Sequence, residues 1–63
     1  MITDKELLEW IVRKIEGTRL KAMHAHARGD NVAFENINRE LSYWLGLEKV
    51  MEERVKENGN ADV

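Results

Sequence analysis

The chain has 63 residues, of which 43% are hydrophobic and 35% are charged, and it contains no cysteine and no proline. This length allows one small domain, and the absence of cysteine excludes disulfides and thiolate metal sites. The net charge of −2 gives no general attraction to nucleic acids or anionic membranes. Because a core of this size supplies only about 3–5 kcal/mol of stability, we expect the chain to self-associate.

The first helix is expected to span residues 4–28. Thr3 and Glu6 fit a capping box, and Ile2 and Leu7 fit a hydrophobic staple. Gly17 falls opposite the apolar stripe, where it loosens the helix without ending it. At about 100° per residue, one broad stripe collects Leu7, Leu8, Ile11, Val12, Ile15, Thr18, Ala22, Ala25 and His26.

The strongest break in the chain is the turn signal at residues 28–31, Arg-Gly-Asp-Asn. Gly29 is the residue type that adopts a left-handed conformation after a helix, and Asp30 or Asn31 caps the next helix. The turn is therefore placed at 29–30 and a second helix at 31–57. Asn58-Gly59 is expected to end that helix, which leaves 59–63 as a flexible tail. The second apolar stripe consists of Ala33, Phe34, Ile37, Leu41, Trp44, Leu45, Leu47, Met51 and Val55.

These elements predict an all-α fold, an antiparallel two-helix hairpin over residues 1–58. Folding about Gly29 sets the small Ala25 and Ala22 opposite the large Phe34 and Ile37, as good interdigitation requires. Both stripes are wider than one antiparallel partner covers, so two hairpins are expected to dimerise into a four-helix bundle. The residues expected in self-association are Leu7, Leu8, Ile11, Val12, Ile15, Leu41, Trp44, Leu45 and Met51.

In length and plan, though in no motif, the chain resembles the small plasmid-encoded Rop-type proteins. Proteins of that type are antiparallel helical hairpins that dimerise into four-helix bundles. The resemblance therefore implies the same assembly and carries no functional residue with it.

Glu48 interrupts the second apolar stripe, opposite Ile11 or Val12. One interpretation is that its side chain extends to solvent from a narrow gap in the stripe. The other is a polar layer that fixes the register or the oligomeric state, as single polar residues do in coiled coils.

No combination of residues in the sequence predicts catalysis, a cofactor or a metal. His24 and His26 point about 160° apart on a helix, so they cannot chelate one ion. His26 is expected to be partly buried and hydrogen-bonded to a neighbouring turn. Ser42 is the only serine and has no histidine opposite it. A hairpin also lacks the deep pocket in which catalytic pKa values are shifted.

The outer side of the first helix is the most informative surface. Between residues 13 and 28 the chain carries five cationic side chains against Glu16 alone. One interpretation is a footprint for the phosphates of RNA or DNA, or for an acidic protein. The other is a solvated face that balances acidic residues nearby. The candidate partner or nucleic-acid binding residues are Trp10, Arg13, Lys14, Lys21, His24 and Arg28.

Trp10 lies among these charges and off the core stripe. It is interpreted either as a contact between subunits or as an exposed anchor for a partner, since tryptophan is enriched at interface hot spots.

The function expected from these features is that of a small, non-catalytic, homodimeric interaction protein that modulates a partner protein. Its small size and simple helical plan suggest an accessory protein of a bacterium or mobile element. The alternative is a nucleic-acid-binding regulator that uses the basic side of the first helix. No apolar run approaches the roughly 20 residues that span a bilayer, and no signal peptide opens the chain, so a cytoplasmic location is expected.

Overall fold

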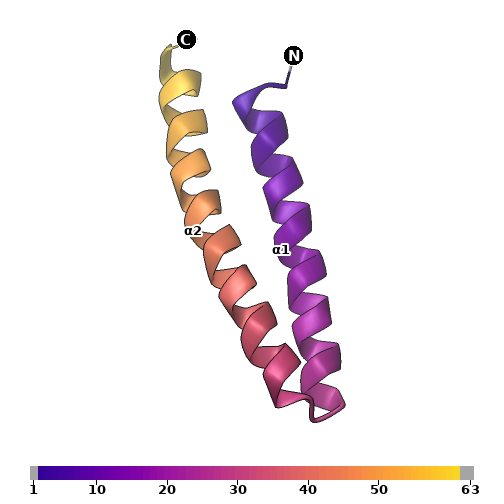
Figure 1. Cartoon of the computed structure of the whole chain (residues 1–63). Coiled ribbons are helices and arrows are strands. Elements are labelled where there is room, and N and C mark those ends of the chain that lie inside the picture. Colours follow the sequence, from indigo (N-terminus) through magenta and orange to yellow (C-terminus); the bar gives the residue numbers. More distant parts are fainter. Residues whose placement is uncertain (1, 62–63) are drawn as a thin grey trace.

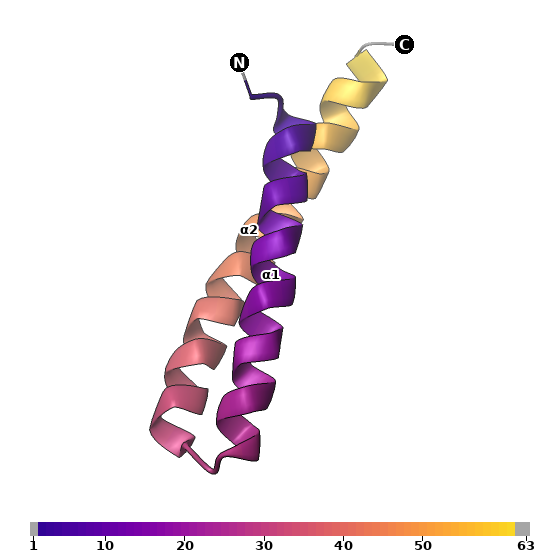
Figure 2. The same ribbon diagram turned by 90° about the vertical axis from the view of Figure 1, so that its right-hand side faces the viewer.

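The computed structural model describes residues 2–61, and their side chains as far as residue 57. It is a hairpin of two helices, α1 (Asp4–Ala27) and α2 (Asn31–Ala61), which lie side by side and antiparallel, so that both ends of the chain are at the same end of the molecule (Figure 1). Seen from the side, the helices cross at a shallow angle (Figure 2). The molecule is a rod of 50 × 16 × 16 Å.

The first helix begins where the capping box predicts. The backbone N–H of Glu6 donates to the Thr3 hydroxyl at 3.1 Å, and that hydroxyl donates to the Glu6 carboxylate at 3.2 Å. One of the free amides of the first turn is therefore satisfied by the Thr3 side chain. Asp4 and Glu6 also place negative charge in the first turn, where the helix dipole favours it.

The turn between the helices is a Schellman motif. Gly29 has φ of +74°, and its N–H donates to the His26 carbonyl at 3.0 Å. The N–H of Asp30 donates to the Ala25 carbonyl, also at 3.0 Å. These two hydrogen bonds satisfy two of the free carbonyls at the end of α1, and the chain reverses its direction within a few residues.

Asp30 is the cap of α2, since its carboxylate accepts a hydrogen bond of 3.1 Å from the N–H of Ala33.

The predicted end of this helix at Asn58-Gly59 is wrong, because α2 continues to Ala61. Glycine inside a helix costs about 1 kcal/mol, but it ends the helix only where it takes a left-handed conformation. Among the described residues Gly29 alone does so. The last two residues of the predicted tail lie outside the described range.

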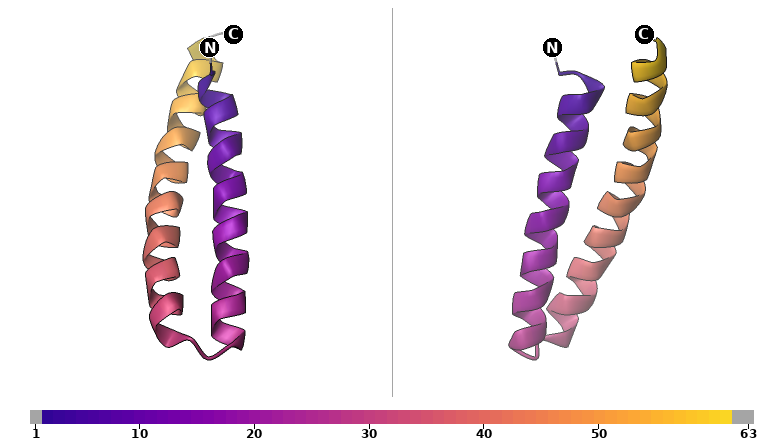
Figure 3. Two further views of the ribbon diagram at one scale, coloured as in Figure 1. Left: turned by 45° about the vertical axis from the view of Figure 1, so that its right-hand side comes forward. Right: turned by 180° about the vertical axis from the view of Figure 1, so that it is seen from behind.

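The two helices are joined by the turn at one end and face each other along the hairpin (Figure 3), and the core lies in the seam between them. Its centre is formed by Ile11, Ile15 and Met51, all buried. Towards the turn the seam narrows to the small buried side chains of Ala22 and Ala25. Four half-buried side chains complete the core: Leu8, Leu41, Trp44 and Leu47.

The hairpin has a large surface for its mass. It exposes 5169 Å², whereas a compact monomer of 7.4 kDa is expected to expose about 4200 Å². Its radius of gyration is 14.7 Å, against about 10.6 Å for a compact domain of this length. The seam between two helices thus leaves roughly 1000 Å² more surface in water than a compact fold would.

Candidate partner-binding groove

Three aromatic rings cluster halfway along the hairpin, two from α2 and one from α1. The ring centroids of Trp10 and Trp44 are 5.5 Å apart with planes at 80°, and those of Tyr43 and Trp44 are 5.3 Å apart at 72°. Both pairs have the edge-to-face geometry that aromatic rings prefer. Trp10 remains 45% exposed, so it contacts the other helix of its own chain and still presents a surface to solvent.

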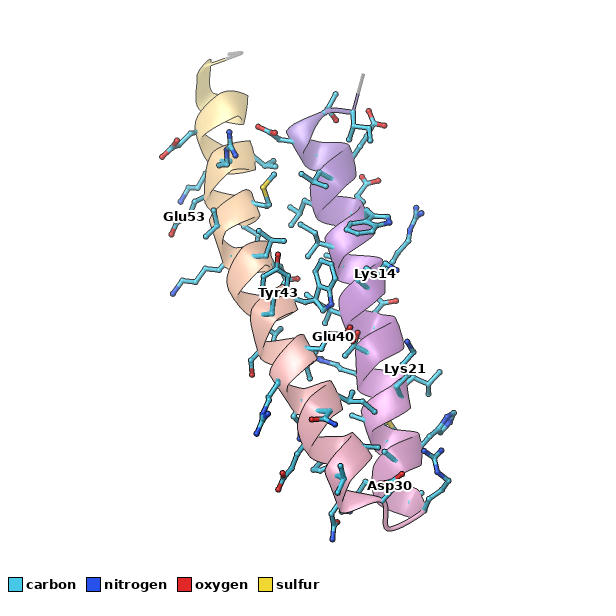
Figure 4. The ribbon with its side chains drawn as sticks, viewed as in Figure 1. Lys14, Lys21, Asp30, Glu40, Tyr43 and Glu53 are labelled. Atoms are coloured by element: carbon cyan, nitrogen blue, oxygen red, sulfur yellow. The ribbon has the colours of Figure 1, made fainter. Side chains whose placement is uncertain are left out.

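A groove runs beside this cluster on one face of the hairpin. It has a volume of about 370 Å³ and lies mainly over the middle turns of α1. Figure 4 looks onto this face, where Lys14 and Lys21 follow each other along α1, and Tyr43 and Glu40 follow each other along α2. We call it the aromatic–basic groove and define it by Trp10, Arg13, Lys14, Gly17, Thr18, Lys21, Glu40 and Trp44.

Three cations line this groove. The ammonium of Lys14 lies 5.2 Å from the centre of the Trp10 ring, a cation–π contact of about 0.5–1 kcal/mol at an exposed site. Arg13 and Lys21 are exposed. The structure gives them no ion pair with any residue in its described range. The groove therefore carries more positive charge than the hairpin itself neutralises.

One carboxylate balances part of this charge. The Thr18 side chain is buried, and its hydroxyl lies 2.7 Å from the Lys14 carbonyl, to which it donates. The same hydroxyl is 3.4 Å from the Glu40 carboxylate. Glu40 thus stands at the wall of the groove that α2 forms, facing the cations of α1.

Of the six side chains predicted to bind a partner, the structure brings four together in the groove: Trp10, Arg13, Lys14 and Lys21. His24 and Arg28 are exposed nearer the turn and do not line it. Arg28 instead forms the C-cap of α1, where its N–H donates to the His24 carbonyl at 3.1 Å.

His26 differs from the sequence-based expectation. It is exposed, and its ring packs against the ring of Phe34 with centroids 5.2 Å apart. The expectation of a partly buried histidine bonded to a turn is therefore wrong. The two rings meet because the short turn brings the first turn of α2 next to the last turn of α1.

A row of apolar side chains runs along the opposite face of the hairpin, with Glu9 and Glu16 beside it. Leu8 and Val12 lie on the His26 side of α1, away from Trp10, and both are half-buried. Leu41 and Leu45 follow Phe34 along α2 at helical spacing. We call this surface the apolar face and define it by Leu8, Val12, Phe34, Leu41 and Leu45.

The nine residues predicted for self-association divide into three groups. Ile11, Ile15 and Met51 are buried within the hairpin itself. Leu8, Val12, Leu41 and Leu45 belong to the apolar face. Leu7 and Trp44 lie on the side of the groove, where Leu7 is 36% exposed.

Glu48 continues the line of the apolar face, one heptad after Leu41 and two after Phe34. It is half-buried and has no hydrogen bond or ion pair to the described residues. The carboxylate is thus close to the apolar surface without being enclosed by it.

The sequence did not identify the α2 wall of the groove. Trp44 was assigned to the core stripe alone, although its ring is long enough to reach from the core to the rim. Thr18 was likewise taken as a core residue. The sequence could have indicated this wall through the pairing of the helices. Folding the chain at Gly29 places α2 residues near 40 and 44 beside Thr18 and Lys14.

Among the described residues, no three His, Cys, Asp or Glu side chains are grouped so that they could hold a metal ion. In the same part of the chain, neither helix is long and apolar enough to cross a membrane. Comparison with protein-family models, curated proteins and solved structures found no match to this chain.

Proposed function

We propose that this protein is a non-catalytic helical interaction protein that acts as a homodimer and modulates a partner protein. Two hairpins pack through their apolar faces into a four-helix bundle. The aromatic–basic groove of each chain then remains on the outside of the bundle, where it is open to a partner. Dimerisation in this arrangement gives one particle two copies of the groove.

The observation that carries the dimer is the size of the exposed surface. The hairpin has roughly 1000 Å² more surface than a compact monomer of its mass, and a standard interface removes about 800 Å² from each partner. The apolar face contributes part of this surface, because four of its side chains are only half-buried and Leu45 is 36% exposed. Packing that face against a second copy supplies the core that 63 residues cannot build alone.

The character of the groove supports binding over catalysis. It is a shallow surface groove, and its polar groups are three exposed cations and one carboxylate beside a hydroxyl. Neither histidine lines it, and Ser42 is exposed on α2 away from both. A surface of this kind matches the composition of interface hot spots, which are rich in tryptophan, tyrosine and arginine.

A second candidate function is nucleic-acid binding. The specific observation in its favour is that Arg13, Lys14 and Lys21 line one groove beside two indole rings, since cations bind phosphates and aromatic rings stack on bases. This function predicts that binding to RNA or DNA weakens steeply with salt and is lost in Lys21→Glu. Absence of binding at low salt would eliminate it.

The dimer is tested by the pair of variants Leu45→Glu and Leu20→Glu. Leu45 lies on the apolar face, whereas Leu20 is 52% exposed on the outer side of α1. Light scattering after size exclusion is expected to show the monomer mass for Leu45→Glu and the dimer mass for Leu20→Glu. The prediction holds whether or not the separated Leu45→Glu chains stay helical. Equal masses for the two variants would refute this interface.

A further inference from the structure

We infer that the aromatic–basic groove binds an acidic amphipathic helix of a partner protein. This inference rests on the proposed interaction function and specifies the partner's chemistry. The helix lies along α1, with an apolar side chain against Trp10 and Trp44 and with carboxylates on Lys14 and Lys21.

The charge of the groove selects an acidic ligand. Arg13, Lys14 and Lys21 stand against the single carboxylate of Glu40, and the described residues offer no ion pair to Arg13 or Lys21. Such a surface attracts an acidic segment and repels a basic one. The Trp10 ring, 45% exposed, adds apolar area of the kind that anchors interfaces.

The spacing of the groove selects a helix. Trp10, Lys14 and Lys21 are separated by one turn and then by two turns of α1, so the Cα atoms of the two lysines are about 10 Å apart along the axis. A second helix has the same rise, and an apolar residue followed by acids at the same spacing therefore meets all three side chains at once. This is the helix-in-groove mode of recognition, which uses anchors three, four and seven residues apart.

Gly17 gives the backbone of that helix room to approach. It lies between Lys14 and Lys21 in the sequence and lines the groove, and a Cβ atom added there would meet nothing within 4 Å. Glycine at this position costs α1 about 1 kcal/mol relative to alanine, and no contact within the hairpin requires it. Close packing of helices does use small residues at the point of contact.

The same geometry argues against single-stranded nucleic acid in this groove. Stacked bases require free ring faces, but the Trp10 ring has the Lys14 ammonium over it at 5.2 Å and meets Trp44 edge to face at 5.5 Å. The Glu40 carboxylate, 3.4 Å from the Thr18 hydroxyl, also repels phosphates at the wall of the groove.

The experiment uses two synthetic helical peptides without tryptophan. Each carries one leucine and two glutamates at the spacing of Trp10, Lys14 and Lys21, and the second peptide has this pattern in the reverse order along its chain. Their charge-reversed versions, with lysine in place of glutamate, and a single-stranded oligo-dT serve as comparison ligands. Binding to the full chain is followed by the fluorescence of Trp10 and Trp44, the only two tryptophans. The variants are Lys21→Glu and Gly17→Glu in the groove. The matched control is Lys49→Glu, the same charge change at an exposed position of α2 outside the groove.

At least one acidic peptide is expected to bind, while the charge-reversed peptides do not. The two groove variants are expected to raise its Kd at least about tenfold, a change of about 1.4 kcal/mol, while Lys49→Glu leaves it within about twofold. The inference is overturned if neither acidic peptide binds at low salt. It is also overturned if oligo-dT binds more tightly than both, or if Lys49→Glu weakens binding as much as Lys21→Glu.

Sedimentation of the same samples separates this inference from the proposed function. A dimer that binds neither acidic peptide removes the inference and leaves the homodimer in place. A helical monomer removes the proposed homodimer, whatever the peptides do.

Discussion

Two side chains in this hairpin contact both the core and the surface groove. Trp44 belongs to the core seam and also meets Trp10 at the rim of the groove, with ring centroids 5.5 Å apart. Thr18 is buried beside the core, and its hydroxyl still reaches Glu40 at 3.4 Å. In so thin a molecule, a long side chain that starts in the core ends at the surface.

The glycines at positions 17, 29 and 46 differ in backbone conformation, and substitution by alanine has different expected effects on them. Gly17 and Gly46 are helical, and a Cβ at either meets nothing within 4 Å, so each change to alanine is expected to stabilise the protein by about 0.5–1 kcal/mol. Gly29 has φ of +74°, so Gly29→Ala is expected to destabilise it by about 1 kcal/mol or more. Urea denaturation measures all three. A lower stability for Gly17→Ala than for the parent would contradict the open space beside Gly17.

At the scale of the helices, the sequence predicted best where the deciding interactions are local. The Thr3 cap of α1 and the left-handed Gly29 after it depend on a few neighbouring residues, and both are present as predicted. The end of α2 was placed too early, because Asn58-Gly59 has a local preference for a turn that the helix overrides. The α2 wall of the groove depends on how far the Trp44 side chain extends, which a helical wheel does not represent.

The start of α2 depends on the Asp30 cap, which accepts from the Ala33 N–H at 3.1 Å. Asp30→Ala removes this bond and also a negative charge near the helix N-terminus, so the free energy of unfolding is expected to fall by about 1 kcal/mol. Thermal unfolding followed by circular dichroism measures the change. Asp30→Asn keeps an acceptor at this position and is expected to lose less. An Asp30→Asn variant as unstable as Asp30→Ala would show that the hydrogen bond is not what stabilises this end.

At the scale of the whole molecule, the two faces of the hairpin have different chemistry. One carries the aromatic–basic groove, and the other carries the apolar face with Glu48 at its end. In the proposed bundle the apolar faces are buried against each other, so Glu48 comes to lie at the subunit interface. A polar residue at such a position weakens association and restricts the number of registers in which two apolar faces pair.

Glu48→Leu is therefore expected to tighten the dimer by about tenfold or more, because leucine continues the line of Phe34 and Leu41. Glu53→Leu is the matched control, since Glu53 is exposed on the outer side of α2. Dilution of each variant, followed by sedimentation, gives the dissociation constants. Similar dissociation constants for the two variants would place Glu48 outside the interface.

The central claim is that the hairpin completes its core with a second copy of itself. The most direct measurement is sedimentation equilibrium of the unmodified protein at micromolar concentration, combined with circular dichroism of the same sample. The expected result is a helical species with twice the 7.4 kDa mass of the chain. A helical species with the mass of one chain would contradict the claim.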